Sequence, residues 1–230
     1  MNIAIIPARG GSKRIPRKNI KEFCGKPMIA YAIKAAKDSG LFQHIIVSTD
    51  DEEIAKVARD FGAETPFIRP AELANDYVAT VPVVAHAIQT CKNFGWHFDI
   101  TCCIYPCAPF LMIEDLKNSF EYLKNNNNAD YCFPVTEFPS MVQRGFKLLN
   151  NGKVESLYPE FELNRTQDIE PTYYDAGQFY WGKNEAWLTN LKIHSNALGY
   201  TIPNWRVVDI DSSNDWRRAE ILAYNFKDFK

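Results

Sequence analysis

The sequence predicts an α/β fold in which a mostly parallel sheet carries helices on both faces. Two observations indicate this class. Through the first 136 residues, short apolar runs alternate with segments whose apolar residues recur at helical spacing, which is typical of parallel sheets with crossover helices. The 230 residues, 46% of them hydrophobic, also suffice for a well-buried core. We therefore expect a single domain over residues 1–230, with ligands bound beyond the carboxyl ends of its strands.

The expected elements follow one another along this first part. Apolar runs predict buried strands over residues 3–7, 45–49, 100–106 and 131–135. Apolar residues at i, i+3, i+4 and i+7 predict a helix through Ile54 and Phe61, and Asp50 with Glu53 resembles a capping box at its start. The same spacing predicts two further helices, over residues 81–88 and 116–123.

The pattern changes after about residue 137. Asn151-Gly152 lies between two alternating segments, which is a strong hairpin signal, and the polar segment that follows carries two prolines. We interpret residues 137–175 as an arm inserted into the domain. The chain then returns through expected strands at 178–182 and 206–211 and ends in a helix from near Ser212. This helix is expected to bury Trp216, Ala219 and Leu222 or Ala223.

Charge and composition exclude several classes of protein. The formal net charge of −2 provides no general attraction for nucleic acid. The chain enters a strand at once, so we expect no signal peptide, and no apolar stretch approaches the eighteen or so residues that span a membrane. The six cysteines lack C-x-x-C spacing, and Cys102 and Cys103 point to opposite faces of a strand. We expect buried free thiols in a reducing cytoplasm.

The loop after the first strand combines small residues with cations. Gly10, Gly11 and Ser12 allow backbone N–H groups to converge, and the cations that follow neutralise negative charge. The loop is neither a Walker A sequence nor a G-x-G-x-x-G fingerprint. Two interpretations stay open, a phosphate-binding loop and a solvated basic turn.

Two carboxylates, Asp209 and Asp211, end a late expected strand. At spacing i, i+2 they face the same side and suit one hard cation such as Mg²⁺, held together with substrate phosphates. The alternative is that Asp211 only caps the final helix.

Two further clusters are less specific. "RPAELAND" (69–76) is by itself more typical of a structural Arg–Asp pair. "RTQD" (165–168) with "YYDAGQFYW" (173–181) is a polar and aromatic stretch, which either hydrogen-bonds a polyhydroxylated ligand or is the entry to a strand with aromatic core residues. The four histidines form no nucleophile or metal pattern, and acyl-transfer chemistry has no support.

In this order, the clusters resemble those of the nonulosonate (sialic-acid-type) cytidylyltransferases. "ARGGSKRIPRKN" is similar to that family's A-R-x-x-S-K-x-x-x-x-K-N signature, and "IIVSTDDEEIA", "RPAELAND" and "DIDSSNDW" resemble its later blocks, so the likeness spans nearly the whole chain. "RTQDIEPTYYDAGQFYWG" looks most like the branch that activates pseudaminic acid.

One block departs from the family. Sialic acid enzymes typically carry Q-P-T-S-P-L-R, where this chain has "YPCAPFL", with Tyr105 for the glutamine and Leu111 for the arginine. A nonulosonic acid other than N-acetylneuraminate is therefore expected.

The resemblance implies a Rossmann-like sheet of the nucleotide-diphosphosugar transferase type, a homodimer in which the 137–175 arm mediates dimerisation, and a requirement for Mg²⁺. It implies the transfer of CMP from CTP to the anomeric hydroxyl of pseudaminic acid, with pyrophosphate as the second product. The CMP-sugar would then supply a glycosyltransferase that decorates flagellin or surface polysaccharide.

The resemblance also assigns roles to residues. Catalysis falls to Lys18, Arg9 and Asp211, and the metal to Asp209 and Asp211. The CTP contacts are Ala8, Arg9, Ser12, Lys13, Asn19, Arg69 and Thr80. The sugar contacts are Tyr105, Arg165, Gln167, Asp175, Gln178 and Tyr180, with the Arg165 guanidinium on the sugar carboxylate.

Three alternatives remain. The same reaction on legionaminic acid, N-acetylneuraminic acid or 3-deoxy-manno-octulosonate is the first. A nucleotide-sensing domain on the same fold is the second. An RNA-binding loop is the third, and the net acidity and the absence of interleaved aromatic residues oppose it.

Overall fold

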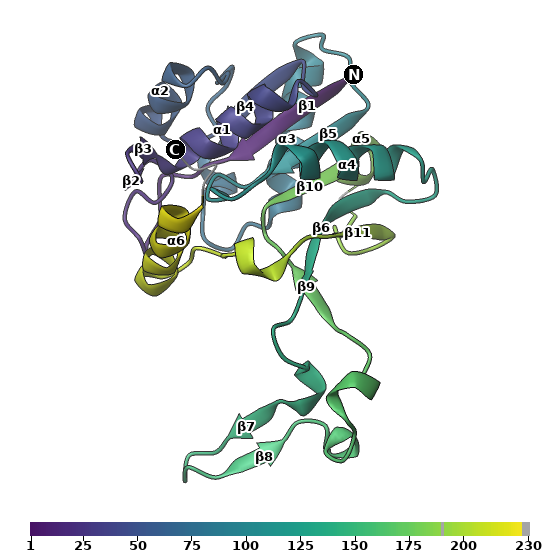
Figure 1. The fold of residues 1–230 in the computed structure, drawn as a ribbon. Helices are drawn as coiled ribbons and strands as arrows, with labels where there is room; N and C mark the ends of the chain where they lie inside the picture. Colours follow the sequence, from purple (N-terminus) through teal and green to yellow (C-terminus); the bar gives the residue numbers. More distant parts are fainter. Residues whose placement is uncertain (190, 227–230) are drawn as a thin grey trace.

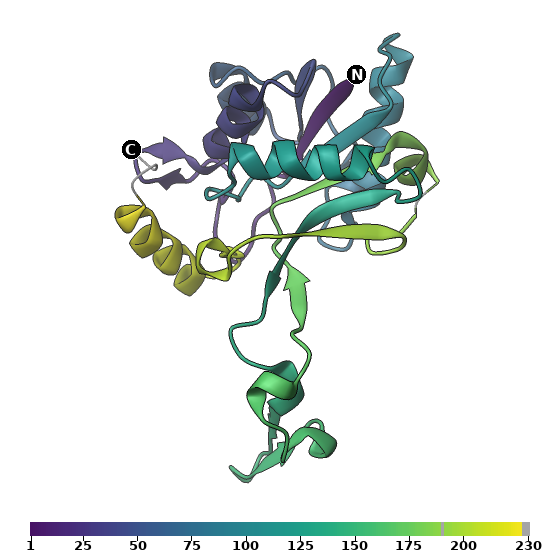
Figure 2. The same cartoon turned by 45° about the vertical axis from the view of Figure 1, so that its right-hand side comes forward.

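A seven-stranded sheet forms the centre of the protein. The computed structural model describes residues 1–189 and 191–226. The main sheet has the order β11-β6-β10-β5-β1-β4, and β9 pairs with β6 beside this path. Helices lie on both sides of the sheet, and an arm extends from the body below it (Figures 1 and 2). The α/β class expected from the sequence is confirmed.

The elements have the following bounds. The strands are β1 (Asn2–Pro7), β2 (Glu22–Phe23), β3 (Lys26–Pro27), β4 (His44–Ser48), β5 (Ile100–Ile104), β6 (Tyr131–Glu137), β7 (Phe146–Leu148), β8 (Val154–Ser156), β9 (Tyr173–Asp175), β10 (Phe179–Lys183) and β11 (Ala197–Thr201). The helices are α1 (Met28–Ser39), α2 (Glu52–Asp60), α3 (Thr80–Asn93), α4 (Ile113–Lys124), α5 (Asn184–Leu188) and α6 (Ser213–Asn225).

Strand direction places several carboxyl ends at one edge of the sheet. β4 and β5 both run parallel to β1. β10 is antiparallel to its neighbours β5 and β6, so β5 and β6 run the same way. The segments that follow β1, β4 and β5 therefore leave from the same edge, and β10 begins there. Ligand sites of open α/β sheets lie at such an edge.

Two apolar clusters hold the helices to the sheet. On one face, Ile33 of α1, Ile54 of α2 and Leu116 of α4 pack against buried strand residues. On the other face, Val84 of α3 and Trp187 of α5 do the same. The clusters contain Cys102 and Cys103 respectively, as their alternation along β5 predicts.

The arm is a narrow extension between β6 and β9. β7 pairs with β8 in an antiparallel hairpin around Gly152, whose φ of 80° suits a glycine in a tight turn. The hairpin expected at Asn151-Gly152 is confirmed. In both views the arm lies well apart from the helices of the body (Figures 1 and 2).

The expected strand at 206–211 is wrong. This segment leaves a short 3-10 helix, Asn204–Arg206, without joining the sheet, and the last strand of the chain is β11, which pairs with β6. The apolar residues are buried all the same, because Val207 packs beside Tyr200 while Val208 and Ile210 pack near α6. Packing alone buries these residues, and it gives the same apolar run in the sequence as a strand that pairs in a sheet.

Three smaller expectations need correction. The residue that caps α2 is Asp51, not Asp50, and its side chain accepts a hydrogen bond from the Ile54 N–H. The helix α1 lies in a region for which the sequence patterns predicted no element. Cys24 is exposed, whereas Cys91, Cys102, Cys103 and Cys132 are buried free thiols as expected.

The closing helix is as predicted. Ser212 caps α6, and its side chain and that of Asp215 form a reciprocal capping box. Trp216, Ala219 and Ala223 face inward. Among the described residues, none of the helices has both the length and the apolar character needed to span a bilayer.

Candidate active site

A cleft of about 390 Å³ opens at the carboxyl edge of the sheet. Its walls come from the loop after β1, the segment after β5, the start of α3 and the segment before α6. Ten residues predicted from the sequence line it: Arg9, Ser12, Lys13, Lys18, Asn19, Arg69, Thr80, Tyr105, Asp209 and Asp211. Segments almost 200 residues apart in sequence thus share one cavity.

The cations of the basic loop make two kinds of contact. Arg17 turns away from the cleft, and its guanidinium donates to both carboxylate oxygens of Asp51, one of them at 2.9 Å. This contact lowers the pKa of Asp51 to about 2. Gly10 is required beside the same carboxylate, because an added Cβ would lie 2.7 Å from an Asp51 oxygen. Arg17 therefore anchors the loop to α2, while Arg9, Lys13 and Lys18 line the cleft.

Lys18 meets the far end of the chain. Its Nζ donates to the Ile210 carbonyl at 2.6 Å and lies 3.3 Å from Asp211 Oδ1. Arg14 contacts the other Asp211 oxygen at 2.9 Å. Because Ser212 is the N-cap of α6, the alternative that Asp211 only caps that helix is wrong. Asp211 instead faces the cations of the opening loop.

Asp209 is the second carboxylate of the cleft. Partial removal from water and the nearby Asp211 carboxylate both raise its pKa, in that order of importance. Two carboxylates in one cleft repel each other, and a divalent cation between them relieves that repulsion. Within the described ranges, no group of three or more His, Cys, Asp or Glu side chains forms a metal site. The protein can thus offer a hard cation two carboxylates, which is the number Mg²⁺ commonly takes alongside phosphate oxygens.

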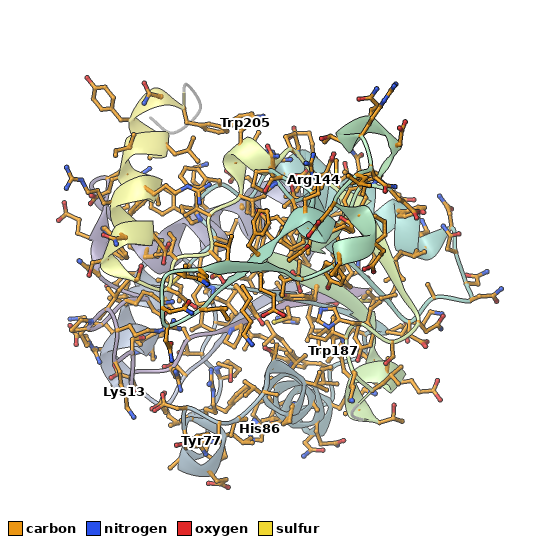
Figure 3. The ribbon with its side chains drawn as sticks, turned by 90° about the horizontal axis from the view of Figure 1, so that it is seen from below. Lys13, Tyr77, His86, Arg144, Trp187 and Trp205 are labelled. Carbon is orange, nitrogen blue, oxygen red and sulfur yellow. The ribbon has the colours of Figure 1, made fainter. Side chains whose placement is uncertain are left out.

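Asp76 is a charged neighbour of the cleft that the sequence analysis interpreted as part of a structural Arg–Asp pair. Arg9 lies 2.8 Å from one of its oxygens and Lys13 contacts the other. The hydrogen bond from Lys13 is the main reason that the pKa of Asp76 is lowered. Lys13 itself extends from the periphery of the molecule (Figure 3), with 80% of its side chain exposed. Asp76 therefore occupies the two cations that an anionic ligand would meet.

Hydrogen bonds to Ser48 hold the Arg69 side chain in place. Its Nε donates to Ser48 Oγ at 3.1 Å, and another guanidinium nitrogen donates to the Ser48 carbonyl. Only 4% of the residue is exposed, and burial lowers its pKa to about 10. Its partner is Ser48, so "RPAELAND" contains no Arg69–Asp76 pair.

Asn19 is oriented by its neighbours. Its Nδ2 donates to the Arg9 carbonyl at 2.9 Å, and Cys107 Sγ lies 3.4 Å from its Oδ1 as a donor. Burial raises the pKa of the Cys107 thiol to about 12, so this thiol keeps its proton at neutral pH. Cys107 was missed by the sequence analysis as a contact of the site, and its place two residues after Tyr105 in the divergent block was the available signal.

Two side-chain hydroxyl groups, those of Thr80 and Tyr105, contact each other in the cleft lining. Thr80 Oγ1 and the Tyr105 hydroxyl are 2.7 Å apart, and the Tyr105 and Tyr180 rings are 5.1 Å apart. The Tyr180 hydroxyl donates to Asp175 Oδ2 at 3.0 Å, and His194 Nε2 lies 3.2 Å from the same oxygen. His194 belongs to no catalytic motif, so the residues around it in the sequence gave no indication of this contact.

Other predicted residues lie outside the cleft lining. Ala8 is fully buried, and its N–H donates to the Ser48 carbonyl at 2.9 Å. Gln178 is buried, and its Oε1 has no hydrogen-bond partner among the described residues. Arg165 and Gln167 are exposed on the arm, at and within a short 3-10 helix, and they do not reach the cleft of their own chain.

The cleft brings cations and carboxylates together at the carboxyl edge of a mostly parallel sheet. This arrangement suits an enzyme that binds a nucleoside triphosphate and transfers its nucleotidyl group. The comparisons with known proteins identify the class. A family model described as Cytidylyltransferase matches residues 3–193, and the chain belongs to this family of enzymes. The alternative of a silent nucleotide-sensing domain is thereby set aside.

Two related enzymes are similar to this chain over nearly its whole length. The chain is 42% identical over 224 residues to the pseudaminic acid cytidylyltransferase of Campylobacter jejuni, covering 96% of this chain and 95% of that protein. It is 30% identical over 223 residues to the CMP-N,N'-diacetyllegionaminic acid synthase of Legionella pneumophila, again covering 96% and 95%.

A solved structure shares the fold. A CMP:2-keto-3-deoxy-manno-octonic acid synthetase complexed with CTP superimposes with a TM-score of 0.72 over 97% of this chain and 98% of that one. The sequence identity is 15%, so this likeness concerns the fold alone.

Proposed function

We propose that this enzyme transfers CMP from CTP to the anomeric hydroxyl of pseudaminic acid and releases pyrophosphate. The observation that carries the proposal is the convergence of Lys18 and Asp211, 3.3 Å apart, in a cleft lined by the cations of the opening loop. The 42% identity to a pseudaminic acid cytidylyltransferase supports the choice of sugar.

The reaction needs positioning and charge neutralisation more than a protein nucleophile. The sugar hydroxyl attacks the α-phosphorus in line while the bond to pyrophosphate breaks. Arg9, Lys13 and Lys18 neutralise the triphosphate, and Lys18 compensates the charge that grows on the departing pyrophosphate. On binding, the triphosphate competes with Asp76 for Arg9 and Lys13.

The remaining nucleotide contacts follow from the cleft lining. Ser12, Asn19, Arg69 and Thr80 line the cavity with the cations, and we assign them to CTP. Ala8 lies outside this lining, and its N–H donates to the Ser48 carbonyl, so we assign it to holding the start of the loop.

Asp209 and Asp211 fit the magnesium ion that the reaction is expected to require. When bound, Mg²⁺ neutralises phosphate charge and acidifies the attacking hydroxyl. Asp211 is held by Lys18 and Arg14, whereas burial and then the Asp211 carboxylate raise the pKa of Asp209. Asp209 is therefore the carboxylate that gains most from a cation.

We assign the sugar to Tyr105, which lines the cleft, and to Asp175, Gln178 and Tyr180, which lie outside the lining. Arg165 and Gln167 lie on the arm, so their contact with a sugar requires the cleft of a second subunit. The arm carries several exposed apolar side chains, among them Phe146 (64% exposed), Leu148 (74%) and Leu163 (99%). Such exposure is typical of a surface that another chain covers.

We therefore propose a homodimer held by the arm. Leu163→Asp with Leu148→Asp should shift the mass measured by light scattering from dimer to monomer, without loss of secondary structure. A wild-type protein that is monomeric at micromolar concentration would exclude this assembly. The buried free thiols support the cytoplasmic location expected from the sequence.

A substrate panel tests the proposed reaction. Pseudaminic, legionaminic and N-acetylneuraminic acids and 3-deoxy-manno-octulosonate are each incubated with CTP and Mg²⁺, and pyrophosphate release and the CMP-sugar mass are measured. We expect the highest kcat/KM with pseudaminic acid. A tenfold or greater preference for another acid would replace the proposed substrate.

A further inference from the structure

Asp76 joins two segments that both line the cleft. One of its oxygens lies 2.8 Å from an Arg9 guanidinium nitrogen, and its other oxygen contacts Lys13 Nζ. Arg9 and Lys13 follow β1, whereas Asp76 lies between β4 and α3, two residues before the lining residues 78–80. Asp76 itself is absent from the lining. A carboxylate from outside the lining thus pairs with two cations inside it.

The two ion pairs of Asp76 remain in contact with water. About 34% of the Arg9 side chain, 33% of the Asp76 side chain and 80% of the Lys13 side chain are exposed. In the ion pair of Arg206 with Asp115, by contrast, each side chain is only 8% exposed. Solvated ion pairs contribute little and exchange partners readily, whereas the removal of one partner from a buried pair is costly. A ligand with several negative charges can therefore displace Asp76 from Arg9 and Lys13.

The turn around Asp76 is held by groups other than its carboxylate. Asn75 Oδ1 accepts from the Tyr77 N–H at 2.9 Å, and Asn75 Nδ2 donates to the Glu72 carbonyl at 2.9 Å. Tyr77 is 97% exposed and extends from the same side of the molecule as Lys13 (Figure 3). The Asp76 carboxylate can thus be displaced or replaced without loss of the turn that carries it.

We propose that Asp76 is an internal competitor for the phosphate groups of the ligand. It pairs with Arg9 and Lys13 in the free enzyme, is displaced by the triphosphate, and pairs with both cations again as pyrophosphate leaves. The inference deepens the proposed function and rests on it. The hydrogen bond from Lys13 is the main reason that the pKa of Asp76 is lowered, so the carboxylate is ionised at neutral pH and available to compete.

Binding of a phosphate ligand is then an exchange of one anion for another. The measured affinity is the intrinsic affinity reduced by the fraction of enzyme in which Arg9 and Lys13 are free of Asp76. On release, the returning carboxylate neutralises the cations that pyrophosphate leaves behind. Asp76 therefore lowers the affinity for pyrophosphate and speeds its departure, and product release limits kcat in many enzymes.

The test compares Asp76→Asn with Glu72→Gln. Both variants remove one negative charge from the same segment, and within the described residues Glu72 forms no ion pair with Arg9 or Lys13. Dissociation constants for inorganic pyrophosphate and for CTP are measured by calorimetry with Mg²⁺ and without a sugar acid. We expect Asp76→Asn to bind both ligands about tenfold more tightly. Glu72→Gln should stay within twofold of wild type.

Two further measurements locate the effect. In a Lys13→Gln background, Asp76→Asn should tighten pyrophosphate only about threefold, because one of the two cations that Asp76 occupies is already absent. The dissociation rate of radiolabelled pyrophosphate, followed by rapid filtration during a chase with unlabelled pyrophosphate, should fall about tenfold in Asp76→Asn.

The sign of the effect separates competition from a structural role. If Asp76 only orients Arg9 and Lys13 for the ligand, Asp76→Asn weakens pyrophosphate and CTP, and that result would overturn the inference. So would an equal tightening in Glu72→Gln, a full tenfold effect in the Lys13→Gln background, or an unchanged dissociation rate. Pyrophosphate that binds neither the wild type nor the variant would overturn it too.

These measurements need no turnover and no sugar acid. If the substrate panel selects an acid other than pseudaminic acid, the proposed substrate fails while the Asp76 effect on pyrophosphate persists. If Asp76→Asn leaves pyrophosphate binding unchanged while pseudaminic acid is the preferred substrate, only this inference fails.

Discussion

Replacement of Lys18 by methionine is expected to lower kcat far more than it lowers the stability of the fold. Lys18→Met keeps the length and apolar stem of the side chain and removes its charge. In the folded protein this costs the contact with the Ile210 carbonyl at 2.6 Å and the Asp211 contact at 3.3 Å. About 21% of the Lys18 side chain and 39% of the Asp211 side chain are exposed, so solvent screens the ion pair.

The two expected losses differ in size. A partly exposed ion pair contributes about 0–1 kcal/mol and a hydrogen bond to a carbonyl about 1 kcal/mol. The free energy of unfolding should therefore fall by roughly 1–2 kcal/mol, which lowers Tm by about 2–8 °C. Loss of a group that stabilises developing charge costs about 10²- to 10³-fold in kcat, or about 2.7–4 kcal/mol of barrier. At 25 °C the variant stays folded and loses most of its activity.

The assay combines steady-state pyrophosphate release at saturating CTP and acid with a thermal melt of the same preparation. Lys21→Met is the matched control, because Lys21 Nζ lies 4.5 Å from the centre of the Trp216 ring and is absent from the cleft lining. It should retain kcat within about twofold. A Lys18→Met enzyme with kcat within threefold of wild type, or an equal loss in Lys21→Met, would refute the assignment of Lys18.

Three further predictions concern the cleft, the pH dependence and the core. Asp209→Asn should raise the Mg²⁺ concentration for half-maximal rate at least about tenfold, measured by initial rates across a Mg²⁺ titration, and an unchanged value would remove Asp209 from the metal site. Asp51→Asn keeps the helix cap but removes one of the two carboxylate partners of Arg17, the other being Glu53, so urea unfolding at pH 7 should show a loss of about 1–2 kcal/mol. The folded pKa of Asp51 is depressed from its ordinary value of 3.8 to about 2. The stability difference between wild type and variant is therefore present above pH 3.8 and disappears as the pH falls through 2. A stability difference that persists at full size at about pH 2 would contradict the charge pairing. Gly182→Ala places a methyl group against the Trp187 indole and should cost about 1–3 kcal/mol of stability, and a melting temperature equal to that of wild type would show that the core yields there.

Local pattern was enough to predict most of the scaffold. Alternating apolar runs predicted β1, β4, β5, β6 and β10, because a strand buried on both faces is apolar throughout. Turn chemistry predicted the hairpin at Gly152, and capping chemistry predicted the start of α6 at Ser212. These signals are local, and the sequence carries them within a few residues.

The same local reasoning placed one strand wrongly. Residues 206–211 are apolar because they pack between the body and α6, not because they pair in the sheet. An apolar run reports burial, and burial has more than one cause.

The sequence by itself determined that cations follow the first strand and that two carboxylates precede the last helix. Only the tertiary structure decided how they are used. It directs Arg17 to Asp51 and Lys18 to Asp211, 193 residues away, and it brings Asp76 and His194 to groups that no motif connects them with. The physical reason is that an ion pair or hydrogen bond depends on the separation of two atoms in space, to within a few tenths of an ångström. That separation is set by how strands and helices pack, and not by the residues on either side of each partner.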